Sequence, residues 1–167
     1  MSESKVEPRV IGMDAWKTGP DTLVPGAEIT SVPGAEITGI SDVEGVWGLG
    51  LYFMPPGIKT TVFSMQEVDD GTADEYYGPC HEFYYLLVGE ATMYWGEDAS
   101  KVREGTADKL HLKAGDLGYW PKGWKYSVKN TGKMPVTWLW GITRAPKGTK
   151  TRPIYSRYTA QMPAWLR

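Results

Sequence analysis

The stretch GDLGYWPKGWKYSVKN, residues 115–130, is the part of the sequence that decides the predicted fold. LGYWP (117–121) and KYSVKN (125–130) contain the aromatic and β-branched residues typical of strands. Gly115 and Asp116 suit a tight reversal, and PKG (121–123) ends one strand and redirects the chain into the next. The stretch therefore predicts two short strands joined by a turn.

The same alternation of short strands and turns continues on both sides. The 20 Gly and 12 Pro divide the chain densely, and no helical periodicity persists beyond a turn or two. Further strands are predicted at GVWGLGLYFM (45–54), IKTTVFSM (58–65), EFYYLLV (82–88), ATMYWG (91–96), KLHLKA (109–114) and VTWLWGIT (136–143). About eight evenly separated strands predict an all-β protein, a sandwich or barrel.

Two motifs then give the chain a family resemblance. Gly115, Pro121, Gly123 and Asn130 fit the second cupin signature, G-x5-P-x-G-x2-H-x3-N, and Glu82 with Gly89 fits the E-x6-G that ends the first. Over residues 45–143 the chain resembles a single-domain cupin. The resemblance implies an antiparallel β-barrel of the jelly-roll type, with residues 1–44 as an N-terminal extension and 144–167 as a basic C-terminal tail.

The metal ligands of the family are mostly replaced. Counting back from Glu82, the two positions where cupins carry histidines hold Glu75 and Tyr77 at one spacing, or Tyr76 and Gly78 at the other, and Tyr126 stands where the second signature has its histidine. We therefore predict that no metal or other cofactor is bound. In the alternative, a divalent ion such as Fe, Mn, Ni or Zn is held by His81, Glu82 and Glu75. His81 then needs a bulge to turn inward.

A cavity lined by one carboxylate and many rings is predicted instead. Glu82, Tyr84 and Leu86 share one strand face, and a carboxylate that opens an apolar run is costly to bury without a partner. We expect Glu82, Tyr126 and Tyr77 to be catalytic. Six further aromatic residues are predicted to bind substrate, from family position, spacing or strand face: Tyr76, Tyr84, Trp95, Tyr119, Trp138 and Trp140. More than half of these rings are nevertheless expected to belong to the core.

This lining favours proton transfer. Desolvation raises the pKa of a buried carboxyl group such as Glu82 toward neutrality, and a tyrosine hydroxyl can donate to a developing enolate oxygen. The sequence thus predicts a metal-independent isomerase, epimerase, lyase or decarboxylase acting on a sugar-like or aromatic carbonyl compound. Two alternatives stay open: a metal-dependent cupin oxygenase or isomerase with altered ligands, and a ligand-binding cupin without catalysis.

Composition excludes several other classes. The net charge of -2 argues against a nucleic-acid binder, and no apolar run is long enough for a membrane span. MSESKVEPR, at the start, is too polar for a secretion signal, which predicts a cytoplasmic protein. The one cysteine, Cys80, is expected to be an inert, partly buried thiol rather than a nucleophile.

The segments outside the barrel suggest contacts at its edges. VPGAEIT occurs twice, at residues 24–30 and 32–38, and we interpret each copy as a turn followed by an edge strand. The tail from residue 143 has six basic and no acidic residues, so we expect it to lie along an acidic face of its own barrel or of a neighbouring subunit, or to form a basic lip for an anionic substrate. Pairing through barrel edges in cupins implies a homodimer.

Overall fold

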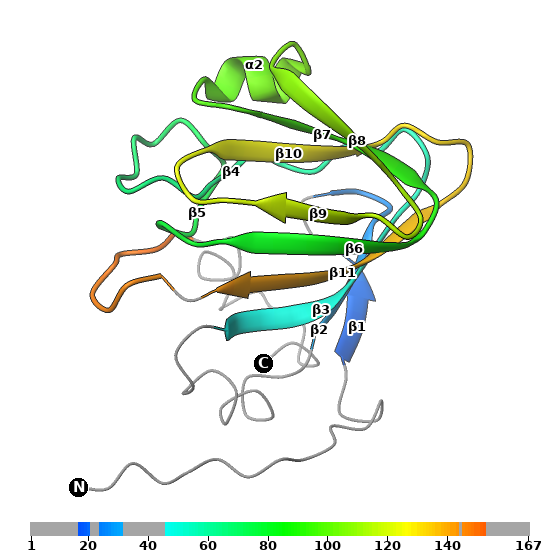
Figure 1. Ribbon diagram of the computed structural model, residues 1–167, viewed down its shortest axis with the longest axis horizontal. Helices are drawn as coiled ribbons and strands as arrows, with labels where there is room; N and C mark the ends of the chain where they lie inside the picture. Colours follow the sequence, from blue (N-terminus) through cyan, green and yellow to red (C-terminus); the bar gives the residue numbers. More distant parts are fainter. Residues whose placement is uncertain (1–16, 21–23, 32–45, 144, 153–167) are drawn as a thin grey trace, which may run out of the picture.

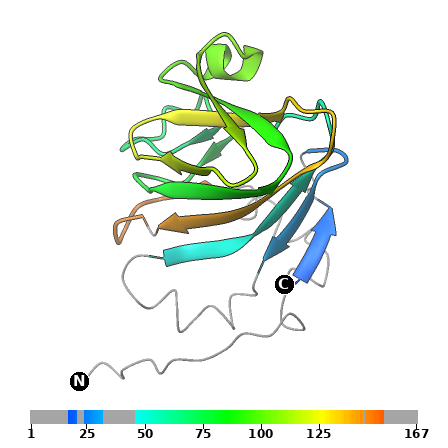
Figure 2. The same cartoon turned by 45° about the vertical axis from the view of Figure 1, so that its right-hand side comes forward.

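Two β-sheets packed face to face make up the protein in a computed structural model that describes residues 17–20, 24–31, 46–143 and 145–152 (Figure 1). In order across the sheet, the six-stranded sheet contains β1 (Lys17–Pro20), β2 (Glu28–Ser31), β3 (Val46–Met54), β11 (Val136–Thr143), β6 (Glu82–Val88) and β9 (Leu117–Trp120). The five-stranded sheet contains β5 (Glu75–Tyr76), β4 (Phe63–Ser64), β10 (Lys125–Asn130), β7 (Glu90–Gly96) and β8 (Asp108–Lys113). Turning the molecule shows the two layers that enclose the core (Figure 2).

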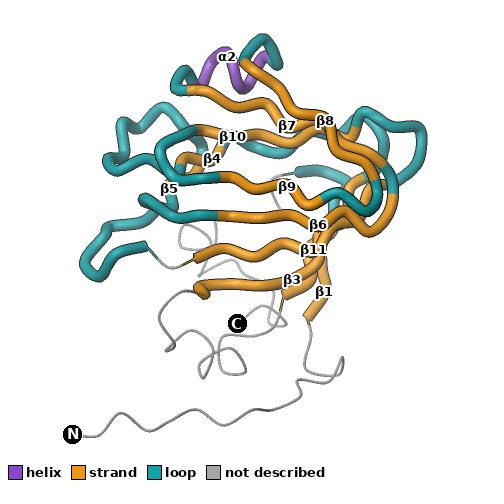
Figure 3. The backbone as a smooth tube through the Cα atoms, in the orientation of Figure 1, coloured by secondary structure: helices purple, strands orange, loops and turns teal. Residues whose placement is uncertain are grey.

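The predicted all-β jelly-roll architecture is confirmed. Strands dominate the described chain (Figure 3), and every pair in the two sheets is antiparallel except β4 with β5. Seven of the eight predicted strands occur within about one residue of the predicted bounds. Among the described residues there is no helix with the length and apolarity to cross a membrane.

The strand predicted at residues 58–65 is wrong in extent. Only Phe63–Ser64 forms a strand, with an isolated bridge between Lys59 and Lys129. The Thr60 hydroxyl accepts a hydrogen bond from the Val128 amide (2.9 Å), while the Thr60 amide donates to the Val128 carbonyl (2.8 Å). The Thr60 hydroxyl thus replaces a backbone carbonyl as the acceptor for the Val128 amide, and this interrupts the regular backbone hydrogen bonding between the two segments.

One short helix, α2 (Ala99–Glu104), was not among the predicted elements. Asp98 caps its start by accepting from the Ser100 amide (2.8 Å), and Gly105 ends it in the left-handed conformation (φ 79°). The helix buries Val102 against Val62 and Ala73, in a small cluster beside the main core. It lies at the β7–β8 end of the five-stranded sheet (Figure 1).

The first VPGAEIT copy is a turn followed by a strand, as predicted. The Ala27 amide donates to the Val24 carbonyl (3.0 Å), and β2 then pairs with β3 on one side and β1 on the other. This copy therefore lengthens the six-stranded sheet. The second copy, at residues 32–38, lies outside the described residues.

The second signature has clear structural reasons. Gly123 has a φ of 101°, which favours glycine, at the turn between β9 and β10. Asn130 is fully buried at the end of β10, where its Nδ2 donates to the carbonyls of Met54 and Met134 (both 2.9 Å) and its Oδ1 accepts from the Gly132 amide (2.9 Å). Asn130 therefore ties three segments of backbone together.

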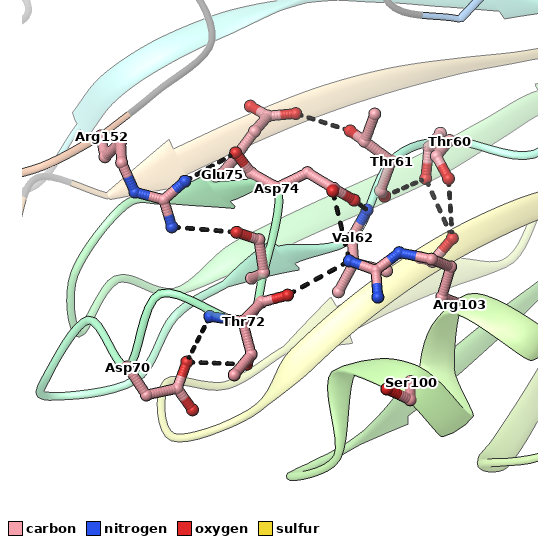
Figure 4. Close-up of polar contacts among 12 residues, drawn as sticks. Thr60, Thr61, Val62, Asp70, Thr72, Asp74, Glu75, Ser100, Arg103 and Arg152 are labelled. Carbon is pink, nitrogen blue, oxygen red and sulfur yellow. Dashed lines mark hydrogen bonds and ion pairs between the residues drawn. The ribbon is translucent and has the colours of Figure 1, made fainter.

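Acidic residues between β4 and β5 form ion pairs with three basic side chains (Figure 4 shows part of this network). Asp69 pairs with Arg152 (2.8 Å), Asp70 with Lys125 (2.6 Å) and Asp74 with Arg103 (3.2 Å). Arg152 belongs to the basic tail, so this part of the tail does lie along an acidic face of its own barrel. Most of the remaining tail, from residue 153, lies outside the described residues.

Asp70→Ala is expected to destabilise the fold by about 2 kcal/mol, because it leaves the Lys125 ammonium buried with only the Glu97 carbonyl as acceptor (2.7 Å). The Asp70 side chain is 46% exposed, which keeps the effect below that of a fully buried pair. The Lys125 bond holds the pKa of Asp70 at about 2. Urea unfolding measures the loss, and Lys125→Met, which removes the buried charge, should cost less. Equal midpoints for Asp70→Ala and the wild type would contradict the prediction.

Candidate functional site

Glu82 begins the inner face of β6. It is 8% exposed, and Tyr84 and Leu86 follow it on the same buried face. Across the sheet, Glu82 lies opposite Trp120 of β9 and Ile142 of β11. Opposed residues share a face of a sheet, so the carboxyl group lies among rings and aliphatic side chains.

This environment makes Glu82 an unusual acid. Burial raises the pKa of its carboxyl group to about 8, the negative charge of Glu75 contributes in the same direction, and a hydrogen bond from Tyr84 opposes both. The Oε2 atom is buried and has no hydrogen-bond partner in the part of the chain that the structure describes. A carboxyl group with this pKa can both release and accept a proton near neutral pH.

The raised pKa should make stability depend on pH. The folded state keeps the Glu82 proton up to about pH 8, whereas the unfolded chain loses it near 4.5, so the free energy of unfolding should fall between these values and level off above them. Glu82→Gln should remove this part of the pH dependence. Urea midpoints of both proteins at a series of pH values measure it, and parallel curves would contradict it.

Glu75 and Tyr77 occupy two of the family's histidine positions and are bonded to each other. The Tyr77 hydroxyl donates to Oε2 of Glu75, and the Thr61 hydroxyl donates to Oε1 (2.8 Å; Figure 4). Glu75 is 7% exposed. The structure thus places Glu75 near enough to Glu82 to affect its pKa, and it makes Tyr77 a residue that holds Glu75.

Tyr126, in the fourth ligand position, lies on the opposite sheet. Its hydroxyl donates to the Pro121 carbonyl, and burial and the charge of Glu82 raise its pKa. Its ring centroid is 5.9 Å from that of Trp120, which in turn is 5.6 Å from Tyr84. Glu82, Tyr84 and Tyr126 therefore belong to one buried cluster, and Trp120 connects the rings of the two sheets.

Two predicted substrate-binding rings face elsewhere. Tyr119 is 55% exposed, because β9 turns Gly118 and Trp120 inward and Leu117 and Tyr119 outward. Tyr76 is buried, but on the side opposite Glu75 and Tyr77, and its hydroxyl donates to the Glu67 carbonyl (2.9 Å). Neither ring lines the space around Glu82.

The other predicted rings lie nearer. Trp138 is buried and stacks on Tyr52 (centroids 4.7 Å apart), with Tyr84 5.3 Å away. Trp140 is half-buried opposite Tyr84 in the β6–β11 register. Trp95 is half-buried opposite Tyr126. Trp138 therefore belongs to the packed core, whereas Trp140 and Trp95 lie between that core and solvent.

His81 and Cys80 make contacts outside the Glu82 cluster. The Tyr119 hydroxyl lies 2.7 Å from Nδ1 of His81, and the two rings stack on the outward side of the sheet. The Cys80 thiol donates to the Tyr77 carbonyl (3.0 Å), and burial raises its pKa to about 12, which keeps it protonated and unreactive.

Sequence reasoning missed Trp120. It is 2% exposed, it lies opposite Glu82, and its Nε1 has no acceptor within the described ranges. The sequence placed two adjacent aromatic residues in β9, and strand alternation alone left open which of them faces inward. The pairing of β9 with β6, which sets Trp120 opposite the buried Glu82, shows that Trp120 faces inward.

The four ligand positions do not fit the metal that the resemblance implies. Glu75 and Tyr77 are bonded to each other, and the buried Tyr126 phenol has a raised pKa, which disfavours the phenolate that would bind a cation. The alternative set fails at His81, which contacts Tyr119. In the part of the chain that the structure describes, no group of three or more His, Cys, Asp and Glu side chains is arranged to hold a metal ion. The chemistry proposed for this site therefore uses none.

The two sheets and the buried site between them define the cupin fold, the double-stranded β-helix. No protein-family model and no curated protein matches the sequence. One similar solved structure is a predicted oxalate decarboxylase from Thermotoga maritima, with a TM-score of 0.57 and 17% identity over 81% of this chain and 99% of that one. Another is an uncharacterized conserved protein with a double-stranded β-helix domain from Klebsiella pneumoniae, with a TM-score of 0.53 and 14% identity over 87% of this chain and 98% of that one. A third is oxalate decarboxylase from Bacillus subtilis, with a TM-score of 0.52 and 18% identity over 84% of this chain and 30% of that one. At these identities the likeness establishes the fold alone, and it confirms the cupin fold predicted from the two signatures.

Proposed function

We propose that the protein is a metal-independent cupin enzyme that transfers a proton at the carbon next to a carbonyl group, with Glu82 as the acid-base. The observation that carries the proposal is the buried Glu82 carboxyl group, whose pKa of about 8 and unpartnered Oε2 suit reversible proton transfer. The reaction class is that of an isomerase, epimerase, lyase or decarboxylase.

The proposed step begins with Glu82 in its carboxylate form, which is the minor form at pH 7 because the pKa is raised. The carboxylate takes a proton from the substrate carbon, and the electrons of that C–H bond form an enolate whose negative charge lies on oxygen. The Tyr84 hydroxyl, whose bond to Glu82 weakens once that carboxylate has taken up the proton, then donates a hydrogen bond to this oxygen. The Tyr126 hydroxyl can do so only if it gives up its bond to the Pro121 carbonyl. Glu82 finally returns the proton to the same carbon or to a neighbouring one.

Glu75 has a separate part in this scheme. Its carboxylate, held by Tyr77 and Thr61, keeps a negative charge near Glu82 and so helps to hold the Glu82 proton until substrate is bound. Tyr77 acts through Glu75 and is a positioning residue. Among similar structures, the Bacillus subtilis protein bears the name oxalate decarboxylase, and this chain spans about a third of its length. Decarboxylation likewise ends with delivery of a proton to carbon, which supports the reaction class only broadly.

A ligand-binding cupin without catalysis is the second candidate. The close packing of Trp120, Tyr126 and Leu86, each at most 2% exposed, favours it, because a substrate has to displace side chains to reach Glu82. Such a protein binds a ligand without exchanging any of its hydrogens.

Proton exchange in D₂O distinguishes the two. Protein dialysed against a chelator should keep its fold and should replace α-hydrogens with deuterium in one or more members of a panel of ketones, aldehydes and sugars. Loss of the α-hydrogen signals in proton NMR measures this exchange. Binding of panel members with exchange in none of them would support the binding protein. Exchange that disappears with the chelator and returns with added metal would contradict the metal-independent proposal.

A further inference from the structure

Among the described residues, three tryptophan N–H groups on the inner faces of the sheets have no hydrogen-bond acceptor. The buried nitrogens are Nε1 of Trp95, Trp120 and Trp140, and they accompany Oε2 of Glu82, which also lacks a partner. A buried donor without an acceptor loses its bond to water and gains nothing in return, so each of these atoms is destabilising in the structure as it stands.

Strand register places these donors around the Glu82 strand. Trp120 lies opposite Glu82 on β9, and Trp140 lies opposite Tyr84 on β11, so the two indoles flank the Glu82–Tyr84 segment from both neighbouring strands. Trp95 lies on the other sheet, opposite Tyr126. Opposed residues share a face, and Glu82, Tyr84 and Tyr126 are all buried, so the three donors belong to the inside of the barrel.

Among the side chains that the structure describes, those around this space supply negative charge and no free cation. Glu75 and Glu82 are the carboxyl groups, and Lys125 is the only buried Lys, Arg or His among the residues that the structure describes. Its ammonium is already bonded to Asp70 and to the Glu97 carbonyl. Arg152, the described residue of the basic tail nearest to the acidic loop, is likewise held by Asp69 and by the carbonyls of Ala73 and Asp74.

We propose that the site binds an uncharged, oxygen-bearing molecule, a ketone, aldehyde or ester, whose oxygens accept hydrogen bonds from the indole N–H groups. Neutral donors satisfy a carbonyl oxygen well. A ligand carboxylate, in contrast, would be buried beside the negative charge of Glu75 and would oppose the ionisation of Glu82 that catalysis needs. No free buried cation among the described residues compensates it. This inference rests on the proposed function for the location of the site, and it goes beyond it by naming the substrate class. An uncharged substrate removes decarboxylation from the reaction classes, because a decarboxylase acts on a carboxylate.

Pairs of a methyl ester and its parent acid test whether the site prefers an uncharged ligand to a negatively charged one. Methyl pyruvate with pyruvate, and methyl benzoylformate with benzoylformate, differ within each pair by the methyl ester alone. Isothermal titration at pH 7 should show that an ester binds at least about tenfold more tightly than its acid, because like charges in a buried site repel. An acid that binds as tightly as its ester, or the failure of both esters to bind at millimolar concentration, would overturn the inference.

Trp120→Phe tests the donor. The phenyl ring keeps a planar apolar group in the core and removes the N–H, so the ester should bind about fivefold more weakly. Trp138→Phe is the control for packing. It removes the same atoms from the same core, but the Trp138 nitrogen is not one of the buried nitrogens that lack an acceptor. Equal weakening in both variants would show that volume and not the hydrogen bond matters, and it would count against the indole donors.

The two proposals fail separately. Only the pyruvate pair has α-hydrogens, so it alone reports on exchange. Methyl pyruvate that binds without any α-hydrogen exchange would remove the proposed catalysis and leave the neutral substrate class standing. Exchange observed with pyruvate but not with methyl pyruvate would keep Glu82 as the acid-base and overturn the neutral class.

Discussion

Glu82→Gln is expected to lower the rate of catalysed proton exchange by about 100-fold or more, which is the usual contribution of general acid-base catalysis. Glutamine keeps the size and planarity of the side chain, but it cannot take up or release a proton near neutral pH. Ligand affinity should change little, because the amide can still bond with Tyr84. The expected signature is a loss of turnover with nearly constant binding.

The pH profile of the wild type gives an independent check on this residue. Since the carboxylate is the active form in the first step, the rate should rise with pH and level off near the Glu82 pKa of about 8. Tyr126→Phe should cost less than Glu82→Gln, because it removes one hydroxyl and leaves the ring in the core. Exchange by Glu82→Gln at the wild-type rate would exclude Glu82 as the acid-base.

Asn130→Ala is expected to destabilise the protein by about 3 kcal/mol, the largest effect on folding that we predict. The substitution removes the donors that satisfy the carbonyls of Met54 and Met134 and the acceptor that satisfies the Gly132 amide, in a fully buried position. The free energy of unfolding from urea titration measures the loss.

Two further variants make this result specific. Asn130→Asp keeps the shape but turns a carboxylate oxygen toward two carbonyls, so it should be at least as destabilising and should partly recover at low pH, where the carboxyl group can donate. Lys133→Ala, at an exposed position three residues away, should change stability by about 0.5 kcal/mol at most. An Asn130→Ala protein as stable as Lys133→Ala would contradict the role of Asn130 as a backbone tie.

The fold could be predicted because its signals are local. Strand residues separated by glycine and proline turns located seven strands. Gly123 stands where the backbone has a positive φ, and Asn130 stands where three backbone groups need a hydrogen-bond partner. The short helix also had local signals, Asp98 before it and Gly105 after it, which a search for longer helical periods passed over.

The site was less predictable because its geometry depends on pairing between distant segments. Alternation within β9 is equally compatible with Tyr119 or Trp120 inside, and only the register with Glu82 selects Trp120. Spacing likewise left Tyr76 and Tyr77 as alternatives until β5 paired with β4. The interruption at Thr60 depends on a hydroxyl that reaches a strand 68 residues further along the chain, which no local pattern contains.

The tryptophans around Glu82 also provide an intrinsic fluorescence signal from the site. Trp120 lies opposite the carboxyl group, and Trp138 and Trp140 lie on the adjacent strand, so the emission of these three indoles should respond to events at Glu82. Among the described tryptophans, Trp95 and Trp124 form a second pair, with centroids 5.1 Å apart and planes at 85°. Ligand entry and Glu82 ionisation therefore have a spectroscopic readout in the unlabelled chain, and single tryptophan-to-phenylalanine replacements can assign the emission to individual rings.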